Sequence, residues 1–195
     1  LTSVTIPNSV TSIGSGAFSL CSSLTAFYGK FASEDNRCLI INGTLNSFAP
    51  AGITSYTIPD SITEIRSYAF YGCHSLTRVT IGNGVTEIGG FAFFDCTSLT
   101  TITIPHSVTS IGKSAFYYCS SLTAITIPNS VITIKGRAFY GCESLTSIII
   151  GNRVTSIEDY AFDGCKKLTS ITLPDSVTSI GEYAFYNCES LTAIT

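Results

Sequence analysis

The stretch LTTITIPHSVTSIGKSAFYYCSS, residues Leu99–Ser121, decides the fold, because most of the chain repeats it. Its first leucine and its cysteine recur at intervals of 23 residues. A fixed period of this length is typical of a stacked solenoid, in which one repeat cannot bury its apolar side chains alone. The recurring residues are Leu76, Leu99, Leu122, Leu145, Leu168 and Leu191, and Cys73, Cys96, Cys119, Cys142, Cys165 and Cys188.

The first half of the repeat predicts two short extended segments. Apolar and polar residues alternate over Ile102–Ile104, which is the period of a half-buried strand with its threonine pointing outward. Pro105 has no backbone N–H to donate and should end that strand. Val108 and Ile111 predict a second extended segment, which we expect to close at Gly112.

The second half of the repeat predicts one helical turn. Ala115, Phe116 and Cys119 stand at i, i+1 and i+4, which would place them on one side of a helix. We expect all three side chains to point into the core shared by neighbouring repeats.

The predicted fold is an α/β repeat, a right-handed leucine-rich repeat solenoid of mostly short β-strands with one helical turn per repeat. A single array should span residues 1–195. Leu1 and Thr195 both lie inside repeats, without the polar caps that close a solenoid, so we expect a fragment of a longer protein.

Residues 24–52 break the period, because 29 residues separate Leu24 from Ile53. Apolar residues flank Asn42-Gly43, a dipeptide typical of tight β-hairpin turns. We therefore expect an irregular repeat with an inserted hairpin. Insertions in solenoids commonly form the binding face, so the hairpin is a candidate site, although a purely structural elaboration is an equal alternative. The candidate residues are Arg37, Asn42, Gly43 and Thr44.

Composition narrows the possible functions. The chain has 195 residues, 45% of them hydrophobic and 12% charged, so it can build a sizeable core. A formal net charge of −3 opposes binding to nucleic acid, which needs a basic surface. No apolar run reaches the length of about 18 residues that a membrane span needs.

The consensus I-P-x-S-V-T-x-I-G-x-x-A-F-x-x-C, at Ile104–Cys119 and Ile127–Cys142, resembles the BspA-type leucine-rich repeat family. The interruption from Gly29 to Gly52 resembles one found in bacterial members of that family. The resemblance covers essentially the whole chain. It implies a cell-surface or secreted bacterial protein that binds host proteins or other cells, and it implies no fixed catalytic residues.

The cysteines invite a disulfide or metal interpretation, but free, buried thiols are the stronger prediction. The repeated cysteine faces inward, and parallel Cβ vectors do not suit the dihedral angle of a disulfide. No C-x-x-C spacing suggests zinc. His74 and His106 stand alone, without a matched nucleophile and base. We expect no catalytic residues, no cofactor and no metal site.

Aromatic residues flank the Ala-Phe pair of each repeat and form the main candidate surface. They should be partly exposed, and tyrosine-rich surfaces are frequent in protein recognition. The alternative is that stacked neighbours simply cover one another between coils. The candidate residues are Tyr68, Tyr71, Phe91, Phe94, Tyr117, Tyr118, Tyr140, Tyr160, Tyr183 and Tyr186.

We therefore expect a non-catalytic adhesion or binding module, extracellular or at the cell surface, with a protein or cell-surface ligand. The alternative is a passive spacer that presents another domain. A contiguous exposed aromatic or hairpin patch would favour the binding module, and a uniformly polar exterior would favour the spacer.

Overall fold

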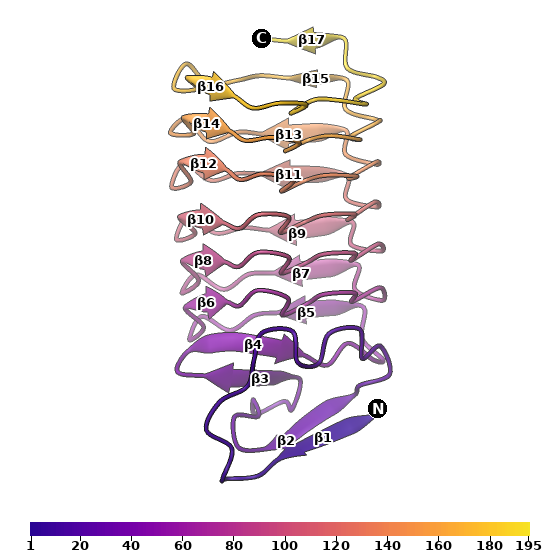
Figure 1. Cartoon of the computed structure of the whole chain (residues 1–195), viewed down its shortest axis with the longest axis vertical. Coiled ribbons are helices and arrows are strands. Elements are labelled where there is room, and N and C mark those ends of the chain that lie inside the picture. Colours follow the sequence, from indigo (N-terminus) through magenta and orange to yellow (C-terminus); the bar gives the residue numbers. More distant parts are fainter.

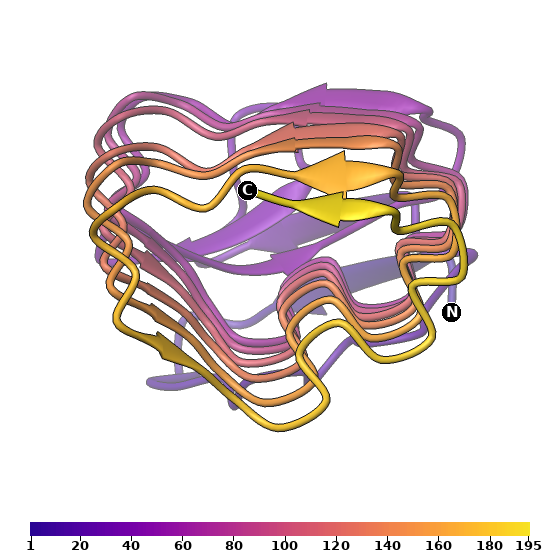
Figure 2. The same ribbon diagram turned by 90° about the horizontal axis from the view of Figure 1, so that it is seen from above.

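The computed structural model describes residues 1–195 as a solenoid whose coils stack along one long axis. The two termini lie at opposite ends of the stack (Figure 1). Seen along that axis, the coils overlie one another closely over most of the chain (Figure 2). The fold is a β-solenoid of leucine-rich repeat type, and it contains no helix that is apolar and long enough to span a lipid bilayer.

The first side of each coil is a short strand that follows the repeat's leucine. In the coil of Leu99, Ile102 is buried while Thr101 and Thr103 are exposed, as the alternation predicts. Pro105 follows the end of this strand. Strands of this side that pair do so in parallel. They are β1 (Ser3–Ile6), β2 (Ala26–Gly29), β5 (Ser55–Thr57), β7 (Arg78–Thr80), β9 (Thr101–Thr103), β11 (Ala124–Thr126), β13 (Ser147–Ile149), β15 (Ser170–Ile171) and β17 (Ala193–Ile194).

The second side carries an eight-stranded sheet with the order β16-β14-β12-β10-β8-β6-β4-β3. Ile111 is buried and pairs with Ile88 and Ile134, so the predicted second extended segment is confirmed. Apart from the antiparallel pair β3–β4, neighbours are parallel. The strands are β3 (Cys38–Ile41), β4 (Thr44–Phe48), β6 (Glu64–Ile65), β8 (Glu87–Ile88), β10 (Ser110–Ile111), β12 (Thr133–Ile134), β14 (Ser156–Ile157) and β16 (Ser179–Ile180).

The third side contains no helix, so the predicted helical turn is wrong. Ser114 and Tyr118 have φ values of 56° and 57°, which a right-handed helix does not accommodate. The N–H groups of Phe116 and Tyr118 donate to Ala138 and Tyr140 of the next coil. These amides are therefore unavailable to the i−4 carbonyls that a helix needs. The turns of this side still point Ala115, Phe116 and Cys119 inward, and all three are buried.

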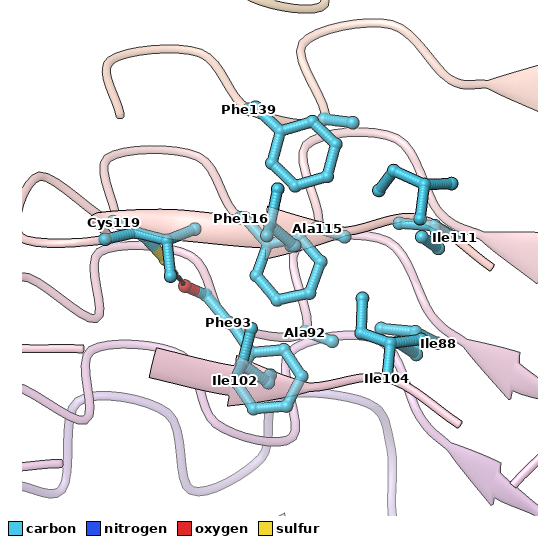
Figure 3. Packing of buried hydrophobic residues seen from close by; sticks show 14 of the residues in the cluster. Ile88, Ala92, Phe93, Ile102, Ile104, Ile111, Ala115, Phe116, Cys119 and Phe139 are labelled. Carbon is cyan, nitrogen blue, oxygen red and sulfur yellow. Dashed lines mark hydrogen bonds between the residues drawn. The ribbon is translucent and has the colours of Figure 1, made fainter. Parts of the chain in front are cut away.

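Phenylalanines form a column through the core. The ring centroids of Phe116 and Phe139 are 5.3 Å apart with planes 3° from parallel, and those of Phe93 and Phe116 are also 5.3 Å apart. Figure 3 shows these three rings stacked above one another. Offset stacking of this kind adds to the free energy gained by burying the rings.

The repeated cysteines form a second buried column of free thiols. Cys119 Sγ lies 3.1 Å from the carbonyl oxygen of Phe93, the contact drawn as a dashed line in Figure 3. Cys142 makes the same contact with Phe116 at 3.3 Å. The thiols from Cys96 to Cys188 thus donate to a backbone carbonyl of the preceding coil, and the prediction of packed thiols is confirmed.

The irregular repeat contains an antiparallel hairpin whose strands are β3 and β4. Asn42 and Gly43 form its turn with φ values of 52° and 79°. The hairpin does not project from the solenoid, because β4 pairs in parallel with β6 and continues the eight-stranded sheet. At its end Phe48 joins the phenylalanine column, with its centroid 4.7 Å from that of Phe70.

The hairpin divides the core unequally. A small cluster under the first two repeats contains Leu24, Phe27 and Leu39, while the main cluster begins at Cys38 and Leu45. The irregular repeat lacks the third-side segment that the regular repeats share. Ser19 of the first repeat therefore contacts the third repeat directly, with its Oγ 3.5 Å from the carbonyl oxygen of Tyr68.

Candidate functional site

Nine of the ten candidate aromatic residues, all except Tyr118, lie on the third side of the solenoid in two parallel columns. The first column is the residue before each repeat's alanine, and the second is the residue after its phenylalanine. The first column comprises Tyr68, Phe91, Ser114, Arg137, Tyr160 and Tyr183, and the second comprises Tyr71, Phe94, Tyr117, Tyr140, Asp163 and Tyr186.

Backbone conformation sets the direction of the first column. Tyr68, Phe91, Tyr160 and Tyr183 all have φ values between 56° and 67°, in the left-handed region. Bulky side chains rarely adopt this region. Here the coil-to-coil hydrogen bonds hold it in place, since the N–H of Phe91 donates to Lys113 at 3.0 Å. The same conformation turns the alanine and phenylalanine that follow toward the core.

The second column contains an unbroken stack of four rings. The centroids of Tyr71 and Phe94 are 4.7 Å apart, those of Phe94 and Tyr117 are 4.8 Å apart, and those of Tyr117 and Tyr140 are 4.5 Å apart. The planes of each pair lie within 5° of parallel. The stack ends where Asp163 takes the same position in the next coil.

The first column is interrupted. Tyr68 and Phe91 stack with centroids 5.1 Å apart, and Tyr160 and Tyr183 stack at 5.0 Å. Between these two pairs the chain places Ser114 and Arg137. The guanidinium carbon of Arg137 lies 4.8 Å from the ring centroid of Tyr160, a cation–π contact that continues the column toward the C-terminal end of the solenoid.

Stacking covers the faces of the rings and leaves their edges open. Tyr183 and Tyr186 are more than half exposed, and the other members of both columns that carry rings are half-buried. Tyr118 is 43% exposed and meets the ring of Tyr117 edge to face at 4.6 Å. The rings therefore cover one another, as the alternative predicts, and are still partly exposed at their edges.

A hollow of about 470 Å³ opens where the first column is interrupted. Phe91 and Tyr160 bound it along the column, and Tyr117 and Tyr140 line its side. Ser114, only 2% exposed, lies at its floor. Lys113, Arg137 and Asp163 contribute its charged groups.

Electrostatics at the hollow combine two cations with one buried carboxyl. Burial raises the pKa of Asp163, while the hydrogen bond from Asn187 and the charge of Arg137 act in the opposite direction. Burial also raises the pKa of Tyr117, with the neighbouring Tyr118 and Tyr140 adding to the effect. Tyr117 therefore presents a neutral phenol.

A second hollow of about 370 Å³ adjoins the first and shares Lys113, Arg137 and Tyr160 with it. Its acidic groups are already engaged by the backbone. Glu158 Oε2 accepts the N–H of Gly136 at 2.8 Å, and Asp159 Oδ1 accepts that of Glu182 at 2.8 Å. The structure contains no group of three or more His, Cys, Asp or Glu side chains placed to hold a metal ion.

The hairpin residues lie outside both hollows. Arg37 Nη1 donates to the carbonyl of Ala51 at 2.8 Å, so its guanidinium clamps the chain that leaves the hairpin. Thr44 Oγ1 donates to Glu64 at 3.2 Å. Asn42 is exposed at the turn, beside the half-buried Gly43.

Sequence reasoning missed two features near these sites. Tyr56 Oη lies 3.2 Å from Cys38 Sγ and 3.1 Å from Asp35 Oδ2, a buried-to-surface relay that fastens the irregular repeat to the third one. Burial raises the pKa of Cys38 to about 12, so this thiol is packed rather than reactive. The second feature is the break at Ser114, which was visible as the one small residue among the first-column aromatics.

Comparison with known proteins assigns the family. Six copies of the BspA type leucine rich repeat region match residues 1–33, 44–165 and 132–195. Among curated proteins, none matches this chain.

Solved structures of bacterial leucine-rich repeat proteins share the fold. A leucine rich cell surface protein from Faecalibacterium prausnitzii A2-165 is 36% identical with a TM-score of 0.68, and the match covers 100% of this chain and 47% of that one. A leucine-rich repeat protein from Bacteroides ovatus ATCC 8483 is 30% identical with a TM-score of 0.73, over 100% and 45% of the two chains.

A leucine-rich repeat protein from Eubacterium ventriosum ATCC 27560 is 29% identical with a TM-score of 0.74, over 98% of this chain and 59% of that one. The chain thus spans about half the length of these relatives. Together the repeat matches and the shared fold show that this chain belongs to the BspA-type leucine-rich repeat family.

Proposed function

We propose that this chain is a non-catalytic binding module of a bacterial cell-surface or secreted protein, and that it recognises host or extracellular proteins, or other cells, through its two aromatic columns. One observation carries the proposal. Partly exposed rings recur from Tyr68 to Tyr186 along a single side of the solenoid.

The stacked arrangement suits recognition for an energetic reason. Each ring is already held by its neighbours, as Tyr117 is between Phe94 and Tyr140. A partner that covers the open edges therefore orders few additional rotamers, and binding costs less conformational entropy. Tyrosine also offers apolar area and a hydroxyl to the same partner.

The partly exposed aromatic side favours a binding module over a passive spacer, which would gain nothing from exposed aromatic edges. The similarity to a leucine rich cell surface protein supports a location outside the cell. The hairpin turn at Asn42 and Gly43 is a smaller second candidate surface, with Arg37 and Thr44 beside it. We propose that it contributes less, because Arg37 and Thr44 are occupied within the chain.

The test is a binding screen on immobilised extracellular-matrix proteins and glycans with three forms of this chain. The first is the unchanged chain, and the second carries Tyr117→Ser, Tyr140→Ser and Tyr186→Ser. The control carries Thr103→Ser, Thr126→Ser and Thr172→Ser on the exposed strand face. Circular dichroism establishes that all three forms are folded.

We expect the unchanged chain and the threonine control to bind the same protein ligand, and the tyrosine variant to lose most of that binding. Equal binding by all three forms would overturn the aromatic columns as the site. Absence of binding by every form across the screen would favour the spacer and overturn the binding module.

A further inference from the structure

The break in the first column has the dimensions of one missing ring. Rings in this column repeat at 5.1 Å and 5.0 Å, so the three coil steps from Phe91 to Tyr160 span about 15 Å. Arg137 fills the step next to Tyr160, with its guanidinium carbon 4.8 Å from that ring. About 10 Å are then left between Phe91 and the guanidinium, enough for one flat group stacked on both.

Both walls of this gap are flat. One face of Phe91 stacks on Tyr68 with planes 2° from parallel, and its other face looks toward the gap over Ser114. The opposite wall is the planar guanidinium of Arg137, which stacks well on π systems. A saturated sugar ring offers no π face to a guanidinium, whereas an aromatic side chain offers one to each wall.

A neighbouring ring supports the side of the gap. In the two coils on the N-terminal side of the gap, first-column and second-column rings meet obliquely. The ring centroids of Tyr68 and Tyr71 are 5.9 Å apart, and those of Phe91 and Phe94 are 5.8 Å apart. Tyr117 is the second-column ring of the Ser114 coil and has no such partner. A ring inserted over Ser114 would meet Tyr117 as Phe91 meets Phe94.

Charge at the gap indicates what should flank the inserted ring. Lys113 is exposed at its rim and Arg137 forms one wall. Asp163, the carboxyl that lines the hollow, is 4% exposed and is held by Asn187 at 3.5 Å. Glu158 and Asp159 line the adjoining hollow and accept backbone N–H groups. Among the residues that line the hollow itself, the accessible charged groups are therefore the cations Lys113 and Arg137, while the exposed carboxylates of Glu158 and Asp159 face the adjoining hollow.

We propose that the hollow over Ser114 is an insertion site for one aromatic side chain of a partner polypeptide, with acidic residues beside that side chain lying against Lys113 and Arg137. This rests on the proposed function, since it names the chemistry by which the aromatic columns would hold a protein ligand. The inserted ring completes the column between Phe91 and Arg137.

The absence of tryptophan from this chain permits a direct test. The probe is the peptide acetyl-Asp-Asp-Trp-Asp-Asp-amide, whose fluorescence carries the only tryptophan signal in the mixture. The comparison peptides replace Trp with Ala, read by isothermal titration calorimetry, or replace each Asp with Lys. All titrations use one buffer of fixed ionic strength, because charge contacts at an exposed rim are screened by salt.

Ser114→Tyr is the informative variant, because it fills the gap with a ring of the chain itself. Tyr stands in the same column at Tyr68, Tyr160 and Tyr183, and Tyr183 has the same φ value of 56° as Ser114. The backbone conformation at Ser114 therefore accommodates a tyrosine. Ser19→Tyr, at the second-column position of the first repeat and outside the hollow, is the control for adding a tyrosine to this side. Lys113→Ser tests the charge at the rim, since Ser67 holds that position in another coil.

We expect saturable binding of the acidic tryptophan peptide, weakened about tenfold or more by Ser114→Tyr and unchanged by Ser19→Tyr. Lys113→Ser should reduce the ratio of the affinity for the acidic peptide to the affinity for the basic peptide. Equal binding of the alanine peptide, or binding insensitive to Ser114→Tyr, would overturn the insertion site. A further result would also overturn it. If oligosaccharides displace the peptide, and their own binding is lost in Ser114→Tyr, the hollow is a glycan site.

The two proposals fail separately. If no peptide binds while the tyrosine triple variant still loses its protein ligand, the insertion site is wrong and the binding module stands. If the peptide binds over Ser114 but the triple variant keeps its ligand, the gap accepts aromatic groups and the columns are not the recognition surface.

Discussion

The guanidinium of Arg137 lies 4.8 Å from the ring centroid of Tyr160, in the column where lower coils place Tyr68 and Phe91. A cation has thus replaced a ring without ending the stack. The coil below, at Ser114, has neither ring nor guanidinium. This pair of substitutions interrupts the first column between Phe91 and Tyr160, and the gap distinguishes these coils from their neighbours.

The loss of stability when a phenylalanine of the core column is truncated should depend strongly on its position in the column. Phe116→Ala should lower the free energy of unfolding by about 3–5 kcal/mol, because the ring is fully buried and stacked on both faces. Phe185→Ala should cost distinctly less, since Phe185 is only partly buried and stacks on Phe162 alone. Urea unfolding followed by circular dichroism measures both. Equal losses would show that the column is not a continuous core.

The thiol column should make the protein sensitive to alkali. Burial raises the pKa of Cys188 to about 11 and that of Cys38 to about 12, against an unfolded value of 9.0, and it raises the pKa of Cys119 as well. Above pH 9 the unfolded chain releases protons that the folded chain retains, so the free energy of unfolding falls as pH rises. Below pH 8 these thiols contribute no dependence on pH.

Urea midpoints measured between pH 7 and pH 10.5 test this expectation. Each buried thiol adds a slope of up to about 1.4 kcal/mol per pH unit above its unfolded pKa. The double variant Cys119→Ala with Cys142→Ala should therefore show a shallower decline than the unchanged chain. A decline of the same steepness in both would mean that the thiols ionise in the folded state.

Replacing glycine by alanine at the same repeat position should destabilise the fold in one coil and leave its stability nearly unchanged in another. A Cβ at Gly112 would lie 2.6 Å from the carbonyl carbon of Gly89, so the coils would have to separate. Gly14 has no heavy atom within 4 Å of the corresponding point. We expect Gly112→Ala to cost about 1–3 kcal/mol and Gly14→Ala to be nearly neutral, as measured by thermal unfolding. A neutral Gly112→Ala would contradict the close approach of these coils.

Arg37 should matter to stability more than to recognition. Its guanidinium donates to Ala51 at 2.8 Å and to Ala49 at 3.4 Å, where the chain returns from the hairpin to the array. Arg37→Ala should lower the free energy of unfolding by about 1–2 kcal/mol through loss of these charge-assisted bonds. Arg78→Ala, at an exposed strand position, is the control and should change little. Equal effects would show that the clamp is not formed in solution.

The sequence was sufficient for the architecture because a period of 23 residues forces equivalent positions to lie above one another. The strand at Ile102, the end of that strand before Pro105 and the inward Phe116 all follow from patterns within one repeat. The buried cysteines follow from the same periodicity. These features depend on local alternation and on burial, which the residue types encode directly.

The prediction of a helical turn failed because spacing alone does not distinguish a helix from turns with left-handed residues at Ser114 and Tyr118. Ala115, Phe116 and Cys119 face inward in both, but the N–H of Phe116 bonds to Ala138 of the next coil. Partners 22 residues away are invisible to a local pattern. The same limit applies to the threonine after each leucine, where Thr100 Oγ1 donates to the carbonyl of Thr77 at 2.9 Å.

The aromatic candidates were visible as a set, but the gap over Ser114 was not identified as a site. Finding it required the stacking distances, the tilt of Arg137 toward Tyr160 and the open face of Phe91. The hairpin shows the opposite error. Its turn was predicted, yet β4 lies within the eight-stranded sheet and does not project as a separate surface.

The thermal unfolding of Ser114→Tyr tests most directly whether the first column is a stack with one vacant position. A tyrosine there would stack on Phe91, contact Tyr117 and meet Arg137, which should raise the free energy of unfolding by about 0.5–1.5 kcal/mol and increase the melting temperature. A melting temperature below that of the unchanged chain would contradict the account, because the position over Ser114 would then not be a space shaped for a ring.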